Sequence, residues 1–197
     1  MKNRMKTLLS KPLLLVVDMQ NVYSKGQKWE CGNFNRALKS IKLLFDYYKD
    51  VNVLFTRYIA SDEPKGIWAD YNEENAEVNA DSWSNEIVED LAKYTDKYKV
   101  IDKAVYSSLS DDEVKMAAES SSCVVVTGVV AECCVMSTVM SLIDAGIYVI
   151  YLKDAIAGAD DETEKATMKV LEGLAPLHLS IMDTNEYLEL RAEAIKG

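Results

Sequence analysis

Four side chains in this sequence carry the chemistry of a nucleophilic hydrolase. Asp18, Lys103 and the adjacent Cys133 and Cys134 all come at or just after the end of a short hydrophobic run. A thiol can attack a carbonyl carbon, and a carboxylate can take up the thiol proton and later deliver it to a leaving amine. A nearby ammonium group lowers the cost of negative charge on sulfur. If these groups converge in space, they form a hydrolytic unit.

The two adjacent cysteines cannot both face the same cleft. They follow Gly128 at an expected helix start, and neighbouring helical residues project about 100° apart. Cys134 in a first helical turn would lie near unpaired backbone amides and the positive end of the helix dipole, which favour a thiolate. The amides of the Gly128 turn can also point at the oxygen of a tetrahedral intermediate. The residues alone leave the choice between Cys133 and Cys134 open.

Hydrophobic periodicity predicts the elements that must position these residues. Continuous apolar runs, typical of strands buried on both faces, predict strands at Leu13–Asp18, Val51–Thr56, Tyr98–Ile101, Val124–Gly128, Ile147–Leu152 and His178–Met182. Helical periods lie between them, at Phe34–Tyr48, Ser84–Tyr94, Ser110–Ser120, Ala131–Ala145, Asp160–Leu174 and Thr184–Ala194. We therefore expect an α/β fold with three α/β/α layers, in which a Rossmann-like, six-stranded, mostly parallel sheet forms a single domain over residues 1–197.

Ligands of open parallel sheets bind beyond the carboxyl ends of the strands. Besides the four residues above, Thr56, Arg57 and Asp154 come at predicted strand ends. We expect Asp154 to anchor its turn rather than to contact substrate.

A long stretch, Ile59–Asp81, is predicted to be irregular and to serve as a lid or binding loop. Aromatic residues in and near it are candidates for the wall of a pocket that takes a planar ligand. These candidates are Trp29, Tyr58, Trp68 and Tyr71. Trp68 and Tyr71 can equally fasten the loop to the core.

Several other residues are expected to have structural roles. Buried cysteines are usually inert, which is the role predicted for Cys123, for Cys133 and, although it lies near the expected crevice, for Cys31. His178 is expected to be a hydrogen-bonded core residue. The helix Ala131–Ala145 is apolar nearly all round, so it should be buried under its own sheet or against another subunit.

Composition excludes several classes of partner. The formal net charge is −10, which disfavours binding to nucleic acid. No apolar stretch approaches the roughly 20 residues that span a bilayer, so no membrane partner is expected. Four cysteines without a disulfide spacing suggest reduced thiols in the cytoplasm. With one histidine and no Cys-x-x-Cys pattern, we assign no metal and no cofactor.

Taken together, several segments resemble the isochorismatase-like cysteine hydrolase superfamily. This superfamily includes nicotinamidases, N-carbamoylsarcosine amidase, ureidoacrylate amidases and isochorismatases. The matching segments are Leu14–Asn21, Phe55–Arg57, Asp102–Ser107, Thr127–Val135 and Lys153–Ala155, in the family's order and at its spacing.

The resemblance implies an Asp–Lys–Cys triad made of Asp18, Lys103 and Cys134. In the family the nucleophile is the cysteine directly followed by valine, which selects Cys134 over Cys133. The resemblance also implies a non-proline cis peptide between Val129 and Val130. That bond would aim the amides of Val130 and Cys134 at the oxyanion.

Departures from the family pattern bear on the substrate. Metal-dependent nicotinamidases carry an Asp-x-His pair and a further histidine after the second strand, but Arg57–Asp62 contains no histidine, which disfavours nicotinamide. Ala131 stands where threonine or serine is frequent, so any contact of that hydroxyl is lost. Isochorismatases typically lack the cysteine, so Cys134 favours acyl transfer over vinyl-ether cleavage.

The sequence thus predicts a cysteine hydrolase that acts on a small amide, carbamoyl or ureido compound through a thioester. The resemblance also implies a homo-oligomer, a dimer or tetramer. Two alternatives remain: an isochorismatase-type vinyl-ether hydrolase that uses Asp18 alone, and a non-enzymatic thiol-based binding or redox module on the same fold.

Overall fold

Six parallel strands form the central sheet of the protein. The computed structural model describes residues 2–47 and 52–196. Within these ranges the strands are β1 Pro12–Val17, β2 Asn52–Tyr58, β3 Lys99–Lys103, β4 Cys123–Val129, β5 Val149–Ala157 and β6 Leu179–Met182. Their order is β3-β2-β1-β4-β5-β6, and every neighbouring pair is parallel. The predicted six-stranded α/β sheet is confirmed, with all of these strands parallel.

The central strands are hydrophobic throughout because both of their faces are covered. Every residue of β1 and β4 is buried. Leu14 and Val16 of β1 pack into one core, whereas Leu13 and Leu15 point the other way into a second. A strand whose side chains enter two cores has no polar face, so its sequence is a continuous apolar run.

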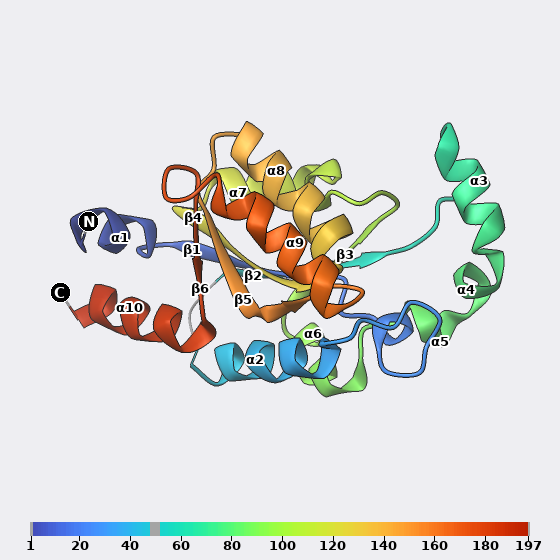
Figure 1. Ribbon diagram of the computed structural model, residues 1–197, viewed down its shortest axis with the longest axis horizontal. Helices are drawn as coiled ribbons and strands as arrows, with labels where there is room; N and C mark the ends of the chain where they lie inside the picture. The colour runs from blue at the N-terminus through green and yellow to red at the C-terminus, as the bar shows by residue number, and fades with distance from the viewer. Residues whose placement is uncertain (1, 48–51, 197) are drawn as a thin grey trace.

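Helices cover both faces of the sheet, which confirms the three layers (Figure 1). On one face lie α7 Asp112–Glu119, α8 Met136–Asp144 and α9 Asp161–Glu172. On the other lie α2 Phe34–Tyr47, α6 Ala92–Thr95 and α10 Thr184–Lys196. The short helix α1 Lys2–Leu8 packs beside α10 and has too few residues to show a helical period.

The predicted helices that became α2, α7, α9 and α10 are present, with ends that differ by a few residues. The predicted helix end Tyr48 and strand start Val51 lie outside the described residues. In the part of the chain that the structure describes, no helix is both long enough and apolar enough to span a bilayer.

The prediction of one helix over Ser84–Tyr94 is wrong. The segment holds the end of α5 Ser82–Asn85, a 3-10 turn η2 Glu89–Leu91, and the start of α6. Between α5 and η2 the backbone forms hydrogen bonds with the segment that follows β1. The amide of Val88 donates to Met19 O at 2.9 Å, and that of Asn21 donates to Glu86 O at 2.9 Å. These tertiary bonds outweigh a weak local helix propensity.

The stretch Ile59–Asp81 is not irregular as predicted, because it contains α3 Ile67–Glu74 and α4 Ala76–Ala80. No residue of α3 is buried, and Figure 1 places α3 at the far end of the molecule from α1. Among the hydrophobic side chains of α3, only Trp68 and Tyr71 turn inward, and two half-buried aromatic residues are too few to show a helical period in the sequence.

The outer side of α8 is not covered by its own chain. Thr138, Val139 and Leu142 are buried against the sheet, but Met140 is 37% exposed. Within the single chain the helix is therefore not buried all round, which leaves the second of the two predicted alternatives, burial against another subunit. Coverage by another subunit stays a prediction, which light scattering in solution would test.

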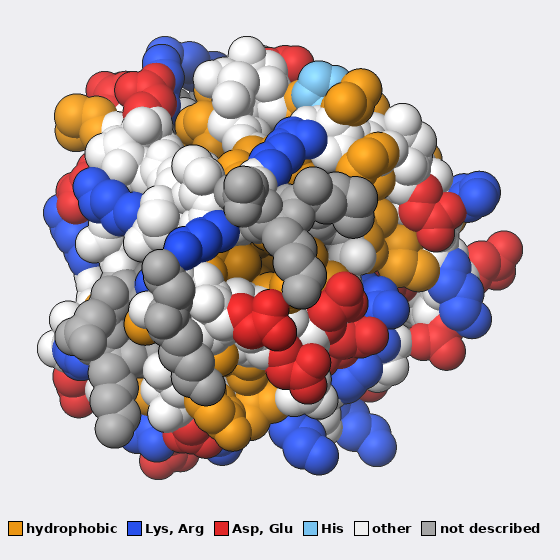
Figure 2. All heavy atoms as spheres, turned by 90° about the vertical axis from the view of Figure 1, so that its left-hand side faces the viewer, with side chains coloured by type: hydrophobic (Ala, Val, Ile, Leu, Met, Phe, Trp, Pro, Cys, Tyr) orange, Lys and Arg blue, Asp and Glu red, His pale blue; other side chains and the backbone are white. Residues whose placement is uncertain are grey.

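The core position predicted for His178 is also wrong. β6 begins one residue later, at Leu179, and the imidazole is exposed, as the pale blue side chain in Figure 2 shows. The contribution of His178 to the fold is its backbone carbonyl, which accepts from the amide of Val149 at 3.1 Å. A turn that enters an edge strand leaves side chains open to water.

Gly128 allows β1 and β4 to approach each other next to the reactive residues. It pairs with Val17 in the sheet and has φ +106°, a conformation that L side chains rarely adopt. A Cβ atom at this position would lie 1.9 Å from Val17 O. Only glycine fits at this point of the sheet.

We predict that Gly128→Ala prevents folding or lowers the free energy of unfolding by more than about 4 kcal/mol, because backbone atoms of β1 cannot move aside. Gly146→Ala is the matched control: φ is +76° there, but a Cβ would meet nothing within 4 Å. It should cost only the left-handed strain of about 1–2 kcal/mol. Urea unfolding measures both, and equal losses would contradict the steric argument.

Candidate active site

The reactive residues meet where the strand order reverses. In the order β3-β2-β1-β4-β5-β6 this point lies between β1 and β4, and ligands of such sheets bind beyond the carboxyl ends there. Asp18 directly follows β1, and Cys134 lies in the turn after β4. Lys103 is the last residue of β3 and reaches in from two strands away.

Asp18 and Lys103 form an ion pair that is closed to water. Lys103 Nζ lies 2.6 Å from Asp18 Oδ2, and both side chains are 0% exposed. Nζ also donates to Val105 O at 3.1 Å. Burial is the largest single influence and lowers the pKa of Lys103, but the interactions with Asp18 and Cys134 together outweigh it and the pKa is raised, so the ammonium keeps its proton. Its charge is therefore available to any anion that forms beside it.

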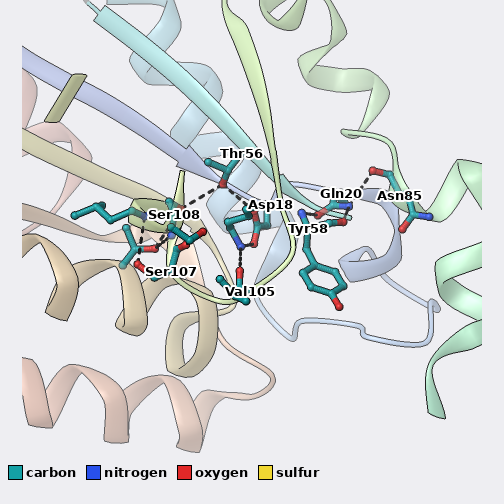
Figure 3. Close-up of polar contacts among 12 residues, drawn as sticks. Asp18, Gln20, Thr56, Tyr58, Asn85, Val105, Ser107 and Ser108 are labelled. Atoms are coloured by element: carbon teal, nitrogen blue, oxygen red, sulfur yellow. Dashed lines mark hydrogen bonds and ion pairs between the residues drawn. The ribbon is translucent and has the colours of Figure 1, made fainter. Parts of the chain in front are cut away.

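A chain of buried hydroxyl groups holds the second oxygen of Asp18 (Figure 3). Thr56 Oγ1 donates to Asp18 Oδ1 at 2.8 Å and lies 3.5 Å from Ser108 Oγ. Thr138 Oγ1 donates to Ser108 Oγ at 3.2 Å and accepts from the Ser108 amide at 2.9 Å. The backbone of Asp18 needs this support, because its φ of 49° is left-handed. Thr56, a strand-end residue in the sequence, thus acts through Asp18.

The turn that carries the cysteines is wider than an α-helix. The Val129–Val130 peptide is cis, and Ala131–Val135 forms a π-helix before α8 begins at Met136. The amide of Val135 donates to Val130 O at 3.1 Å, five residues back. The predicted helix Ala131–Ala145 therefore starts with a π turn, a feature frequent at functional sites. In this turn Cys134 is buried and Cys133 is half-buried.

Cys134 sits against both members of the ion pair. Burial raises its pKa well above the ordinary value, the charge of Asp18 and a hydrogen bond with Asp18 raise it further, and Lys103 lowers it. The net direction is upward. The expectation that the helix start favours a resting thiolate is thus not met, because burial beside a carboxylate dominates. At neutral pH the site holds a thiol next to a carboxylate that can accept its proton.

Cys134 opens into a cavity of about 330 Å³. The other residues that line this cavity are Tyr23, Lys28, Trp29, Glu30, Cys31, Tyr71, Tyr106, Val130, Glu132, Cys133 and Ala159. Of the four aromatic residues predicted as pocket wall, Trp29 and Tyr71 line this cavity. Tyr58 and Trp68 stand behind them, with the Tyr58 ring centroid 6.2 Å from that of Trp29 and 6.2 Å from that of Trp68.

Sequence reasoning missed several lining residues. Tyr23, Tyr106 and Glu132 each lie within five positions of Asp18, Lys103 or Cys134 in the chain. Proximity to those residues is the signal that would have found them. Glu30 is missed although it lies between Trp29 and Cys31, which the sequence analysis singled out.

Gln20 fastens the aromatic wall to the site. The buried side chain donates from Nε2 to Tyr58 O and to Asn85 O, each at 2.9 Å, and its Oε1 accepts from the Tyr58 amide at 2.8 Å (Figure 3). Both the nitrogen and the oxygen of the Gln20 side-chain amide are hydrogen-bonded. A substitution that changes the length or charge of this side chain would therefore break the bonds that hold Tyr58.

Two strand-end candidates do not join the site. Arg57 pairs with Asp102 at 2.5 Å and with Glu86 at 2.9 Å. Asp154 lies within β5 and accepts from Ser40 Oγ at 2.9 Å and from the amide and hydroxyl of Thr184 at 2.8 Å. The expectation that it follows this strand and anchors its turn is wrong, because β5 runs on to Ala157; Asp154 instead ties α2 and α10 to the sheet.

The likeness of this chain to known proteins agrees with the geometry. The profile of the isochorismatase domain matches residues 12–186. The chain belongs to the isochorismatase domain family. No significant match is found among curated protein sequences. Members of this family are generally hydrolases, a class of activity that a buried thiol beside an ion pair would suit.

Solved structures of three other proteins have the same fold. A cysteine hydrolase from Pseudomonas syringae pv. phaseolicola 1448A superposes with a TM-score of 0.78 at 22% identity, over 95% of this chain and 94% of that one. An isochorismatase-like hydrolase from Alkaliphilus metalliredigens gives 0.72 at 20%, over 91% and 98%. A nicotinamidase from Bacillus subtilis gives 0.72 at 16%, over 88% and 99%. At these identities the likeness shows the fold.

Breaking the buried ion pair should destabilise the protein strongly. We predict that Lys103→Met lowers the free energy of unfolding by about 3–5 kcal/mol, because the Asp18 carboxylate stays buried without its counter-charge. The double variant Asp18→Asn/Lys103→Met should lose less than Lys103→Met alone, since no charge is left uncompensated and asparagine tolerates the left-handed backbone. Urea unfolding tests this, and a double variant that is the less stable of the two would contradict it.

The pH dependence of alkylation should report the raised pKa of Cys134. We predict that iodoacetamide labelling of Cys134 reaches half its maximal rate well above pH 9, whereas in the unfolded chain the half-maximal pH falls near the ordinary thiol value of about 8.5. Peptide mass spectrometry resolves each cysteine. Lys103→Met should move the Cys134 profile further upward because the cation lowers that pKa. A Cys134 rate already at its plateau below pH 8 would contradict the prediction.

Proposed function

We propose that this family member is a cysteine hydrolase that cleaves a small amide, carbamoyl or ureido compound. Asp18 accepts the proton of Cys134 as the sulfur attacks the carbonyl carbon and forms a tetrahedral intermediate. The intermediate collapses to a thioester, and Asp18 returns the proton to the leaving amine or ammonia. Water then attacks the thioester, with Asp18 again as base, and the thiol is regenerated.

One observation carries the proposal: Cys134 is buried close enough to the Asp18–Lys103 ion pair for both of its charges to act on the pKa of the thiol. A lone buried cysteine is usually inert packing. Here a carboxylate that can serve as base lies near the thiol, and the positive charge of Lys103 favours the thiolate. Nucleophile, base and orienting group are the three parts that covalent catalysis requires.

The backbone of the π turn supports a site for the oxyanion. In this proposal the amides of Val130 and Cys134 donate to the carbonyl oxygen of the substrate as it becomes negative. Val130 lines the same cavity as Cys134 and follows the cis peptide that turns the chain away from β4. Such fixed donors are worth about 2.7–4 kcal/mol each in acyl transfer.

The chemistry of the site favours an amide over the alternatives. Vinyl-ether cleavage would need Asp18 but would give the thiol of Cys134 no catalytic role. Nicotinamide, the substrate in the name of the Bacillus subtilis relative, is disfavoured because no histidine follows β2 between Arg57 and Asp62. A redox module would need a thiolate-prone, accessible cysteine, whereas Cys134 is buried with a raised pKa.

Loss of the nucleophile should abolish amide hydrolysis. We predict that Cys134→Ala lowers kcat for ammonia release, screened over a panel of small amides and ureas, by at least about 10³-fold. Cys133→Ala is the control, because Cys133 lines the same cavity but is only half-buried, and its pKa is raised by burial and Glu132, whereas that of Cys134 responds to Asp18 and Lys103. Stability of both variants is measured alongside by urea unfolding.

The outcomes separate the candidate functions. Undiminished turnover in Cys134→Ala with loss in Asp18→Asn would favour acid catalysis of the vinyl-ether type. Turnover of no compound by the wild type, over a panel that includes amides, ureas and vinyl ethers, would favour a binding module. Equal loss in the two cysteine variants would contradict the assignment of Cys134 as the nucleophile.

A further inference from the structure

The walls of the cavity beside Cys134 are unusually rich in aromatic rings. Tyr23, Trp29, Tyr71 and Tyr106 all line it. The rings form a connected set, with centroid distances of 5.7 Å between Tyr23 and Trp29 and 6.4 Å between Trp29 and Tyr71. Trp68 joins Tyr71 to Tyr106 from behind, at 5.3 and 4.9 Å. The π faces of such rings carry partial negative charge and attract cations.

A carboxylate of the same cavity has an unused oxygen. Glu132 Oε1 accepts from the amide of Ala159 at 3.1 Å. Its Oε2 is buried, and among the described residues it has no hydrogen-bond partner. Gly158 makes room for Glu132 Oε2, because a Cβ atom at position 158 would come within 2.8 Å of that oxygen. A buried charged oxygen without a donor is costly, and a cation bound in the neighbouring cavity would relieve part of that cost through its charge, without a direct contact.

The cations near the cavity are committed elsewhere. Lys28 is the only lysine or arginine among its described lining residues, and its half-exposed Nζ lies 3.7 Å from Glu77. Lys103 is held by Asp18. A second carboxylate, Glu30, stands at the exposed rim. Among the described residues that line the cavity, the two carboxylates Glu30 and Glu132 therefore outnumber the single cation, Lys28.

The pKa shifts of two thiols that line the cavity indicate the sign of the electrostatic potential around them. Burial raises the pKa of Cys31 to about 12, and the charges of Glu132, Glu164 and Glu30 raise it further. Burial and then Glu132 raise the pKa of Cys133 as well. This side of the cavity is therefore electrostatically negative.

We propose that the acyl half of the substrate carries a positive charge, a quaternary or protonated amine that is held by the aromatic rings and by Glu132 while its amide carbonyl lies against Cys134. This inference rests on the proposed function, and it narrows the substrate class to small cationic amides. A cavity of about 330 Å³ is at the small end of ligand sites, which suits a charge only a few bonds from the carbonyl. Glu132 then determines specificity and takes no part in bond cleavage.

Three amides of similar size test the sign of the charge. Betaine amide carries a trimethylammonium group, 3,3-dimethylbutanamide is its uncharged isostere, and malonamate carries a carboxylate instead. Binding to the Cys134→Ala protein is measured by isothermal titration calorimetry, so that no turnover is needed. We expect betaine amide to bind at least about tenfold more tightly than its isostere, and malonamate to bind more weakly than either.

The contribution of Glu132 is tested in the same background. Glu132→Gln removes the charge and keeps the shape, so the preference for betaine amide over its isostere should fall by about tenfold. Glu119→Gln, on the exposed outer side of α7, changes the net charge equally and should leave the preference intact. Should Glu132→Gln fail to fold, the order of the three amides on the Cys134→Ala protein decides alone.

Equal affinity for the charged amide and its isostere, or tighter binding of malonamate, would overturn the inference. Each result is distinguishable from a failure of the proposed function. If the cation preference holds while the wild type releases no ammonia from betaine amide or from the wider panel, the hydrolase proposal fails and the cation site stands. If amides are hydrolysed without a cation preference, the reverse is true.

Discussion

The rest of the site depends on one buried ion pair, between Asp18 and Lys103. Two full charges are held 2.6 Å apart with no exposure to water, a burial that is tolerable only when both are well paired and hydrogen-bonded. Thr56 satisfies one oxygen of Asp18, and Val105 O accepts from the ammonium. The pair therefore fixes β1, β2 and β3 relative to each other at the edge where Cys134 arrives. Stability and reactivity are coupled through the same two side chains.

The order of the strands explains why residues so distant in the chain meet. β1 lies at the centre of the sheet, with β2 and β3 on one side and β4, β5 and β6 on the other. The loops after β1 and β4 leave in opposite directions and open a crevice between them. Gly128 lets the two strands stay close up to that point, since a side chain there would strike Val17. The π turn then presents Cys134 from the far wall of the crevice.

The sequence predicted the sheet better than the surroundings of the site. Buried strands such as β1 and β4 have a local signature, because two-sided burial demands an unbroken apolar run. The position of Asp18 at a strand end could be predicted from the sequence, and the structure places it beside Lys103; the choice of Cys134 over Cys133 as nucleophile came from the family likeness and stays a prediction. Features set by long-range contacts have no such signature: Val88 breaks a plausible helix by bonding to Met19, and α3 lacks a buried face. The partnerless oxygen of Glu132 could not be foreseen, since it depends on packing against Gly158.

A raised pKa of the Cys134 thiol has consequences for the mechanism proposed above. Oxidants and electrophiles react with thiolates, so a buried, neutral Cys134 would be protected until substrate is present. In that mechanism the proton would need to travel only to the nearby Asp18, and Lys103 would stabilise the anion at the moment it forms. A positively charged substrate would add to this effect, because a cation placed beside Glu132 offsets the negative field that opposes ionisation of the thiol. Substrate binding and activation of the nucleophile would then be linked by charge.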